Sequence, residues 1–282
     1  MTVRAVALAL ALVSVGGSAA AQSMRPFTTY RQLHGETRLT AALDYAAGSL
    51  RVAPGRPTEL YRMDVSYDGD RYEPISDFDA SHGAVALGLK ATGKGGLRVV
   101  SRNQLRQTAS VTFSPRVDLD VDLALGASDA DIELGGLRVA GWKVQTGASQ
   151  AVVRFSQPNG TRCRSGSVST GAADLTVLGL GNSRCDRLDF EGGIGKMTLD
   201  FGGTWSVSSD VGVKMAVGEL VLRLPRQVGV SIALDKFLAS FNPAGLEQQG
   251  TRYESAGYAG AERKLDITVT TAVGEVRVEW AE

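Results

Sequence analysis

The amino-acid sequence predicts an all-β protein, and within that class a single-stranded, right-handed β-solenoid built from stacked repeats of 21 to 24 residues. Three observations support this prediction. The segment 117–134 alternates apolar and polar residues on both sides of a small-residue corner, and strict period two is the pattern of half-buried strands. The same corner returns along the chain at a nearly fixed spacing. The 282 residues also include 34 glycines and show no extended helical periodicity.

The repeated corner is the most informative of these signals. Copies begin at Gly126, Gly147, Gly171, Gly193, Ala216 and Ala272, and a weaker copy begins at Ala46. The starts from Gly126 to Ala216 are spaced by 21, 24, 22 and 23 residues, the last follows after 56, and the fifth and seventh residues of each copy are apolar. A unit of this length cannot bury its apolar face alone, so neighbouring units should stack. Glycine corners also join the hairpins of meanders, which leaves a closed barrel or a sandwich as the alternative.

The chain between the last two copies predicts one further coil, from the runs VGVSIAL (228–234) and FLASF (237–241). The final arms, within 265–280, are then expected to close the stack. Trp280 occupies the ninth position of its copy, where other copies have Leu or Phe, so we expect it inside the terminal coil. The segment 242–261 has no periodicity, and a loop of that length is usually functional or disordered.

Residues 1–21 have the order of a secretory signal peptide: Arg4, an apolar run, and small residues ending at Ala21. The apolar run is too short to span the hydrocarbon core of a bilayer, about 30 Å thick, which disfavours a membrane anchor. We therefore expect cleavage before Gln22. The mature chain should be soluble and extracytoplasmic, in the periplasm or secreted, with no stable membrane anchor.

The only two cysteines, Cys163 and Cys185, are 22 residues apart, which is one repeat. Equivalent positions of adjacent coils lie about 5 Å apart, near the Cα distance that a disulfide tolerates. Export would bring both to an oxidising compartment. Counted from the corners that precede them, the two positions differ by two residues, which a turn has to absorb. We predict a disulfide between Cys163 and Cys185.

The residues that commonly carry chemistry form no catalytic pattern, and we expect no cofactor and no metal. His34 and His82 are the only histidines and lie far apart, which gives a zinc site or a histidine-based hydrolase little support. Asp118, Asp120 and Asp122 share one strand face, as calcium ligands do, but no glycine–aspartate repeat accompanies them and solvated carboxylates are favoured. The 30 basic and 30 acidic residues cancel, so there is no broad attraction to nucleic acid or an anionic membrane.

Two classes of function fit this sequence. The first is a non-catalytic binding module, and the second is an enzyme that acts on polysaccharides with paired carboxylates along a β-helix groove. The polar outer positions change from coil to coil, as Asp131 becomes Val152 and then Thr176, so no ladder of carboxylates lines a groove. The binding module is therefore favoured. Tyr253 and Tyr258, in the segment without periodicity, are a candidate partner surface for a glycan or a peptide.

Two runs carry a resemblance to known families. The run LDYAAGSLRVAPGRPTELYRMDVSYDGDRYEPISDFD (43–79) resembles the N-terminal toast-rack domain of bacterial envelope proteins. The region 117–280, with DVGVKMAVGELVLRLPRQVGVSIALDKFLASF and ERKLDITVTTAVGEVRVEW, resembles the C-terminal domain of the LiaF-like, cell-wall-active-antibiotics-response group. The resemblance implies a β-solenoid without enzymatic activity and a role in modulating envelope-stress signalling. LiaF proteins differ in carrying membrane helices ahead of the β-domain, where this chain has a cleavable signal.

These observations predict a domain order. Residues 1–21 are a signal peptide, 22–42 a linker or edge element, 43–116 a toast-rack N-terminal β domain, and 117–282 a LiaF-like β-repeat domain continuous with it. The predicted function is that of a non-catalytic exported envelope protein, a binding or scaffolding module in envelope-stress response or adhesion. Its expected partner is an envelope protein or a glycan.

Overall fold

The computed structural model describes residues 23–93 and 106–281, and it is all-β, as the sequence predicts. The predicted signal peptide lies outside the described residues. The strands are β1 Met24–Gln32, β2 Arg38–Pro54, β3 Glu59–Asp68, β4 Tyr72–Asp79, β5 Ala84–Ala91, β6 Thr108–Phe113, β7 Asp118–Glu133, β8 Arg138–Thr146, β9 Gln150–Arg154, β10 Cys163–Leu178, β11 Cys185–Asp200, β12 Ser209–Leu224, β13 Gly229–Asn242, β14 Glu247–Gln249, β15 Arg252–Glu254 and β16 Lys264–Trp280. Two 3-10 turns join them, η2 Leu180–Ser183 and η3 Tyr258–Gly260. Within 23–93 and 106–281, no helix is long and apolar enough to cross a membrane.

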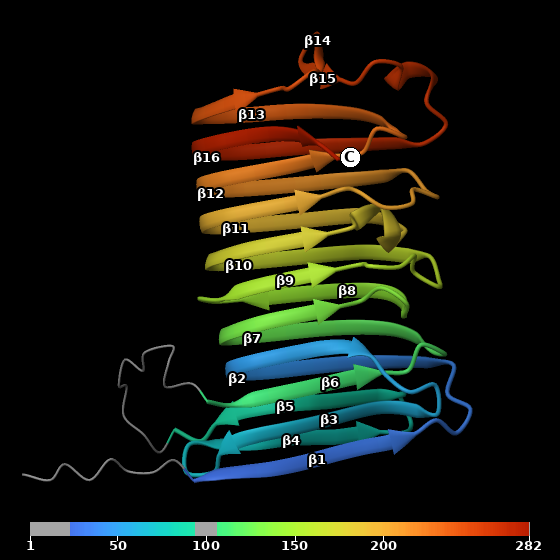
Figure 1. Ribbon diagram of the computed structural model, residues 1–282, viewed down its shortest axis with the longest axis vertical. Coiled ribbons are helices and arrows are strands. Elements are labelled where there is room, and N and C mark those ends of the chain that lie inside the picture. The colour runs from blue at the N-terminus through green and yellow to red at the C-terminus, as the bar shows by residue number, and fades with distance from the viewer. Residues whose placement is uncertain (1–22, 94–105, 282) are drawn as a thin grey trace, which may run out of the picture.

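The long strands stack one above the other along a single axis (Figure 1). Most of the stack is parallel, in the order β2, β7, β8 with β9, β10, β11, β12, β16 and β13. Each long strand bends at its middle, so that it forms two arms on either side of a corner. The predicted repeat register is confirmed at the fourth residue of every copy, which forms the ladder Ser49, Asp129, Gln150, Asp174, Lys196, Glu219 and Glu275.

The order of strands at the C-terminal end differs from the prediction. The last strand, β16, does not close the stack, because it lies between β12 and β13 and pairs with both. The corner explains this order. A Cβ on Gly274 of β16, whose φ is +138°, would collide with the carbonyl oxygen of Gly218 below it. β13 has Ala239 opposite Gly274, and Ala239 does not adopt a positive φ, so β13 ends the run of glycine corners.

At the N-terminal end the parallel stack gives way to antiparallel pairs. β2 is covered by β5 along its first arm and by β6 along its second. β6 then pairs with β3, β3 with β1, and β5 with β4, all antiparallel. β1, in the segment expected to be a linker or edge, is one edge strand at this end, and β4, which pairs only with β5, is the other.

The predicted domain boundaries fall at two places in this end of the stack. The boundary between 42 and 43 lies inside β2, and the boundary at 116 directly precedes β7. β2 and β7 pair in register from Arg38 to Val52, across that second boundary. The two predicted domains are thus joined by one continuous ladder, and their division stays a prediction.

The core runs the whole length of the stack. The fifth and seventh residues of the repeats point into it, and Leu175, Val177, Met197, Leu199, Leu220, Leu222, Val276 and Val278 are all buried. At the ninth position Leu134, Phe155, Phe201 and Leu224 are also buried. Trp280 is only half-buried, which corrects the prediction that it lies inside. β13 pairs with β16 only as far as Arg277 and so does not cover Trp280, whose indole N–H donates to the Ala244 carbonyl of the segment that follows β13.

Candidate functional site

The disulfide between Cys163 and Cys185 is present. The two cysteines are the first residues of β10 and β11 and are register partners, with their Cα atoms 4.2 Å apart. Each lies eight residues before the corner that follows it, Gly171 or Gly193, so the offset of two belongs to the loops that precede the cysteines. Both cysteines are buried, and the Trp142 indole donates to Cys185 Sγ at 3.3 Å. The bond therefore ties β10 to β11 inside the core.

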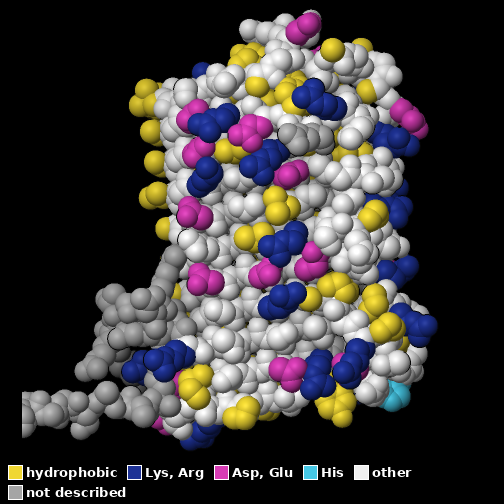
Figure 2. Space-filling view, viewed as in Figure 1, with side chains coloured by type: hydrophobic (Ala, Val, Ile, Leu, Met, Phe, Trp, Pro, Cys, Tyr) yellow, Lys and Arg dark blue, Asp and Glu magenta, His cyan; other side chains and the backbone are white. Residues whose placement is uncertain are grey.

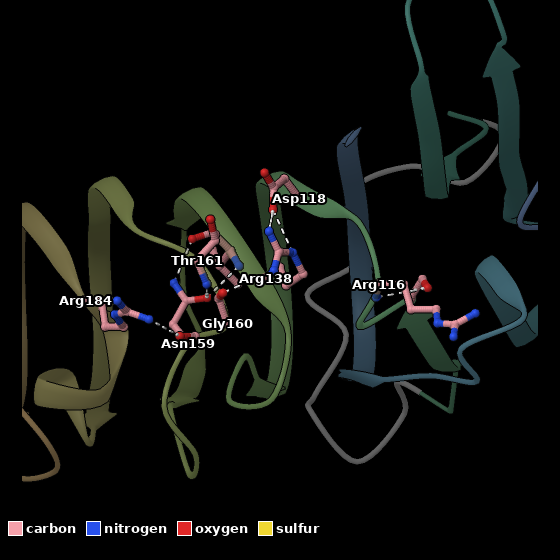
Figure 3. Close-up of polar contacts among 9 residues, drawn as sticks. Arg116, Asp118, Arg138, Asn159, Gly160, Thr161 and Arg184 are labelled. Carbon is pink, nitrogen blue, oxygen red and sulfur yellow. Dashed lines mark hydrogen bonds and ion pairs between the residues drawn. The ribbon is translucent and has the colours of Figure 1, made fainter. Parts of the chain in front are cut away.

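The loops on the side of the stack away from the corners are fixed by buried amides (Figure 3). The Asn159 side chain accepts a hydrogen bond from the Val139 amide at 2.8 Å and donates to the Val139 and Ser183 carbonyls at 2.8 and 2.9 Å. Arg184 donates to the Asn159 carbonyl at 3.2 Å. The Asn159 amide group thus uses its polar atoms to hold successive loops in place, and we assign it a structural role.

The outer carboxylates considered as calcium ligands are each paired with a different base, two of them on the adjacent strand β8 and one on β10, two strands away. Asp118 pairs with Arg138 at 2.8 Å, Asp120 with Arg164, and Asp122 with Lys143 at 3.4 Å. In the part of the chain that the structure describes, no group of three or more His, Cys, Asp or Glu residues is placed to hold a metal ion. The three aspartates are solvated, charge-paired side chains of the outer face.

The two histidines lie in exposed turns at the N-terminal end. His34 contacts the Gln32 carbonyl at 2.9 Å. His82 lies beside Asp79 and Ser81, a trio that the sequence analysis did not notice, and hydrogen bonds from Ser81 and His82 hold the pKa of Asp79 below its ordinary value. The trio is not a catalytic triad, because Asp79 and Ser81 both contact the same ring nitrogen, Nδ1, at 2.5 and 3.0 Å.

The candidate partner residues Tyr253 and Tyr258 are both half-buried in the cap formed by β14, β15 and η3. The Tyr253 ring packs edge-on against Phe241, with centroids 4.8 Å apart. The Tyr258 hydroxyl donates to Asp266 at 2.6 Å, and this bond raises the pKa of Tyr258. Both tyrosines thus make contacts within the chain, and their contact with a partner stays a prediction.

Among the described residues, five of the seven exposed large apolar side chains lie elsewhere, at the corner of β11, β12, β16 and β13, and the other two, Met24 and Tyr30, lie in β1. Ile194, Val217, Val273 and Leu238 are register partners in β11, β12, β16 and β13, and Phe237 lies beside Leu238. Their exposed fractions are 63, 41, 40, 66 and 78% in the order Ile194, Val217, Val273, Leu238, Phe237. Figure 2 shows hydrophobic side chains in a column along the corner edge of the stack. We call these five residues the corner ridge.

The corner ridge has a small-residue continuation toward the N-terminal end. The same corner position is Ala127 in β7, Ala172 in β10 and Ala148 between β8 and β9. Shallow hollows of about 480 and 470 Å³ flank this small-residue part, one beside Arg51, Asp129 and Gln150 and the other beside Asp44 and Gln145. The signal for the ridge was in the sequence: the second residue of each copy is apolar, although a solvated corner does not require it.

Charges around the corner ridge cancel. Along its second-arm side, Glu219 pairs with Lys196 at 3.1 Å and with Arg277 at 3.4 Å. Along its first-arm side, Glu191 pairs with Lys214 at 3.1 Å. The ridge is therefore an apolar strip between neutral, ion-paired margins.

The edge of β13 beside the ridge is open. β15 pairs with only Ser231–Ala233 of β13, and within the described residues the outer edge of 235–242 has no strand partner. Its backbone N–H and C=O groups on that side face solvent. The open edge and the ridge meet at Phe237 and Leu238.

The fold and this surface define an all-β repeat protein with parallel stacked strands and an exposed apolar corner. The chain belongs to the toast-rack family, because the family described as the N-terminal domain of toast_rack, DUF2154, matches residues 21–178. This confirms the resemblance of 43–79, and the LiaF-like resemblance of 117–280 stays a prediction. No curated protein matches the chain.

Several solved structures share its general form. The chain is similar to a putative cell adhesion protein from Clostridium sporogenes ATCC 15579, with 16% identity, a TM-score of 0.49, and 91% of this chain and 100% of that chain covered. It is also similar to a putative adhesin from Bacteroides fragilis NCTC 9343, with 11% identity, a TM-score of 0.41, and coverage of 90% and 97%. Likenesses this distant say nothing about what this chain binds.

Proposed function

We propose that this chain is a non-catalytic, exported β-solenoid that acts as a binding or scaffolding module of the bacterial envelope, in stress response or adhesion. The observation that carries the proposal is the corner ridge. Folded proteins rarely leave large aliphatic and aromatic side chains exposed in one contiguous line unless a partner covers them. The parallel, in-register stack supports the solenoid form, because each coil contacts only its neighbours.

The chemistry of the ridge favours a protein partner over a glycan. Sugars are recognised by exposed aromatic faces and fixed polar groups. Four of the five ridge residues are aliphatic, and the fifth, Phe237, is the single aromatic ring. Tyr253 and Tyr258, the rings expected to engage a glycan, contact Phe241 and Asp266 instead. The ion-paired margins carry no net charge, so the partner surface is expected to be apolar and near neutral.

Two features support export. The first 21 residues have signal-peptide order. The buried bridge between Cys163 and Cys185 persists most readily in an oxidising compartment. An intact mass of the exported protein that lacks residues 1–21 and two protons is the expected result, and a mass that retains Met1 contradicts cleavage.

The binding test uses ridge variants with a matched control. Val217→Asp with Val273→Asp places two carboxylates on the ridge, and Ala127→Asp with Ala148→Asp places two at the same corner position but two or more strands away from it. Envelope proteins captured by the parent and by the control, but lost by the ridge variant, are identified and purified, and binding is remeasured with pure components. Equal capture by all three proteins contradicts the proposal, as does polysaccharide cleavage by the purified chain.

A further inference from the structure

We propose that two copies of this chain associate head to head through the open edge of β13, residues 235–242, and form a closed dimer. This inference concerns self-association and goes beyond the proposed partner binding. It follows from what the open edge offers, from how the opposite end of the stack is protected, and from the charge of the chain.

The partner that best fits an open strand edge is another extended strand. The unpaired N–H and C=O groups of 235–242 repeat along about 26 Å of backbone, and only another strand satisfies them in series. Phe237 and Leu238, the most exposed residues of the corner ridge, lie in the middle of this edge. A strand laid along 235–242 would bury main-chain groups and apolar side chains together.

The most abundant strand that meets this edge is the same edge of another copy. Proteins protect edges against their own copies with proline, like charges or short length. The two edges at the other end follow this rule, because β1 has Pro26 with Arg25 and Arg31, and β4 has Pro74 with three acidic residues. The segment 235–242 has no proline, and its only charges, Asp235 and Lys236, are adjacent and opposite. The β13 edge therefore lacks the protection that β1 has.

Symmetry then limits the assembly to two copies. Two identical edges related by a twofold axis pair antiparallel, and the pairing uses both open edges. The protected β1 and β4 edges do not extend the assembly from the other end. The 30 basic and 30 acidic residues of the chain cancel, so two copies approach without net repulsion.

The size of the contact sets its expected strength. Stable dimers bury about 800 Å² per partner, and one short strand edge with two side chains covers less. The dimer should therefore be reversible and concentration-dependent. It would align two corner ridges end to end and make partner binding bivalent.

The experiment is sedimentation velocity on the mature protein over a wide concentration range. The parent is expected to shift from monomer to dimer. Phe237→Lys with Leu238→Lys places two lysines on the edge, where each meets the like charges of the other copy, and should weaken dimerisation by about tenfold or more. Ile194→Lys with Val217→Lys adds the same charge to the ridge two and three strands from the edge and should dimerise like the parent.

The outcomes separate the alternatives. A parent that stays monomeric at every concentration overturns the proposal, and so does a control that weakens the dimer as much as the edge variant does. Open-ended polymers overturn the closed twofold arrangement. Far-UV circular dichroism and the melting temperature of each variant establish that the fold is kept, and none of these readouts depends on a foreign partner.

Discussion

The two ends of the stack are finished in different ways. At the N-terminal end both arms of β2 are covered, and the antiparallel strands beyond it end in two edges, β1 and β4, each of which carries a proline and charged residues. At the C-terminal end β15 covers only three residues of β13 and leaves the corner ridge and the adjacent edge exposed. The comparison shows that a parallel stack of this kind does not need two closed ends to be complete. The end that is left open is where we place the interaction surface.

The largest expected effect breaks the stack next to its open end. Gly274→Ala puts a Cβ where the Gly218 carbonyl oxygen lies, in a conformation of φ +138° that side chains rarely adopt. We expect a loss of about 4 kcal/mol or more in the free energy of unfolding, measured by urea denaturation. Gly260→Ala meets no atom within 4 Å and should change stability by less than about 0.5 kcal/mol. A Gly274→Ala protein as stable as this control would mean that the corner is not close-packed.

The next effect concerns the disulfide, which joins two adjacent strands in the middle of the stack, between its two ends. Replacing Cys163 and Cys185 together by Ala removes a bridge over 22 residues, and the chain-entropy model puts its contribution at about 3 kcal/mol. Hydrogen exchange would show whether both ends lose protection together, as expected for one cooperative core. Unchanged stability, or a change confined to one end, would argue that the ends unfold separately.

A smaller effect is the difference in stability loss between a core residue at the end of the stack and one in its middle. Phe201 and Trp280 occupy the same repeat position, but Phe201 is buried and Trp280 is half-buried. Phe201→Ala should cost about 3 to 5 kcal/mol and Trp280→Ala about half as much, by thermal unfolding. Equal losses would show that the C-terminal end is as tightly closed as the middle.

The smallest effect is a pH dependence of the cap. The hydrogen bond to Asp266 raises the pKa of Tyr258, so the folded cap holds the phenol proton more tightly than the unfolded chain does. The resulting stability is complete below the ordinary tyrosine pKa of about 10 and is lost as the pH rises through the higher folded pKa. The protection of the amides in 252–266, taken relative to their intrinsic base-catalysed exchange rates, should therefore fall in alkali, and Tyr258→Phe should remove this fall. A cap whose protection falls equally in both proteins contradicts this assignment.

The sequence predicted what depends on local pattern. Period-two alternation placed Leu220, Leu222 and their equivalents in the core, and the spacing of one repeat placed Cys163 beside Cys185. It did not predict that β16 inserts between β12 and β13, because every copy carries the same apolar pattern. The one sequence difference related to the strand order is that β16 has Gly274 where β13 has Ala239. That difference matters only because the corner of β16 is in close contact with the adjacent strand β12.

The candidate site was harder to predict than the fold. Small residues at a corner indicate a turn, and this pattern does not predict that the apolar second residue of a copy, such as Ile194 or Val273, is exposed to solvent. Tyr253 and Tyr258 were chosen for their residue type and their place in a segment without periodicity. Their contacts with Phe241 and Asp266 come from residues distant in the repeat pattern, which no local pattern reveals.

The glycine corners also bear on how such a molecule changes length over time. In β11, β12 and β16 the corner glycines Gly195, Gly218 and Gly274 are register partners, and the carbonyl of each of the first two lies where a Cβ on the next would be. A gene duplication that copies one of these strands with its glycine therefore inserts among them without redesign of its neighbours. Each such insertion lengthens the rod by about 4.8 Å and moves the two ends apart without altering either.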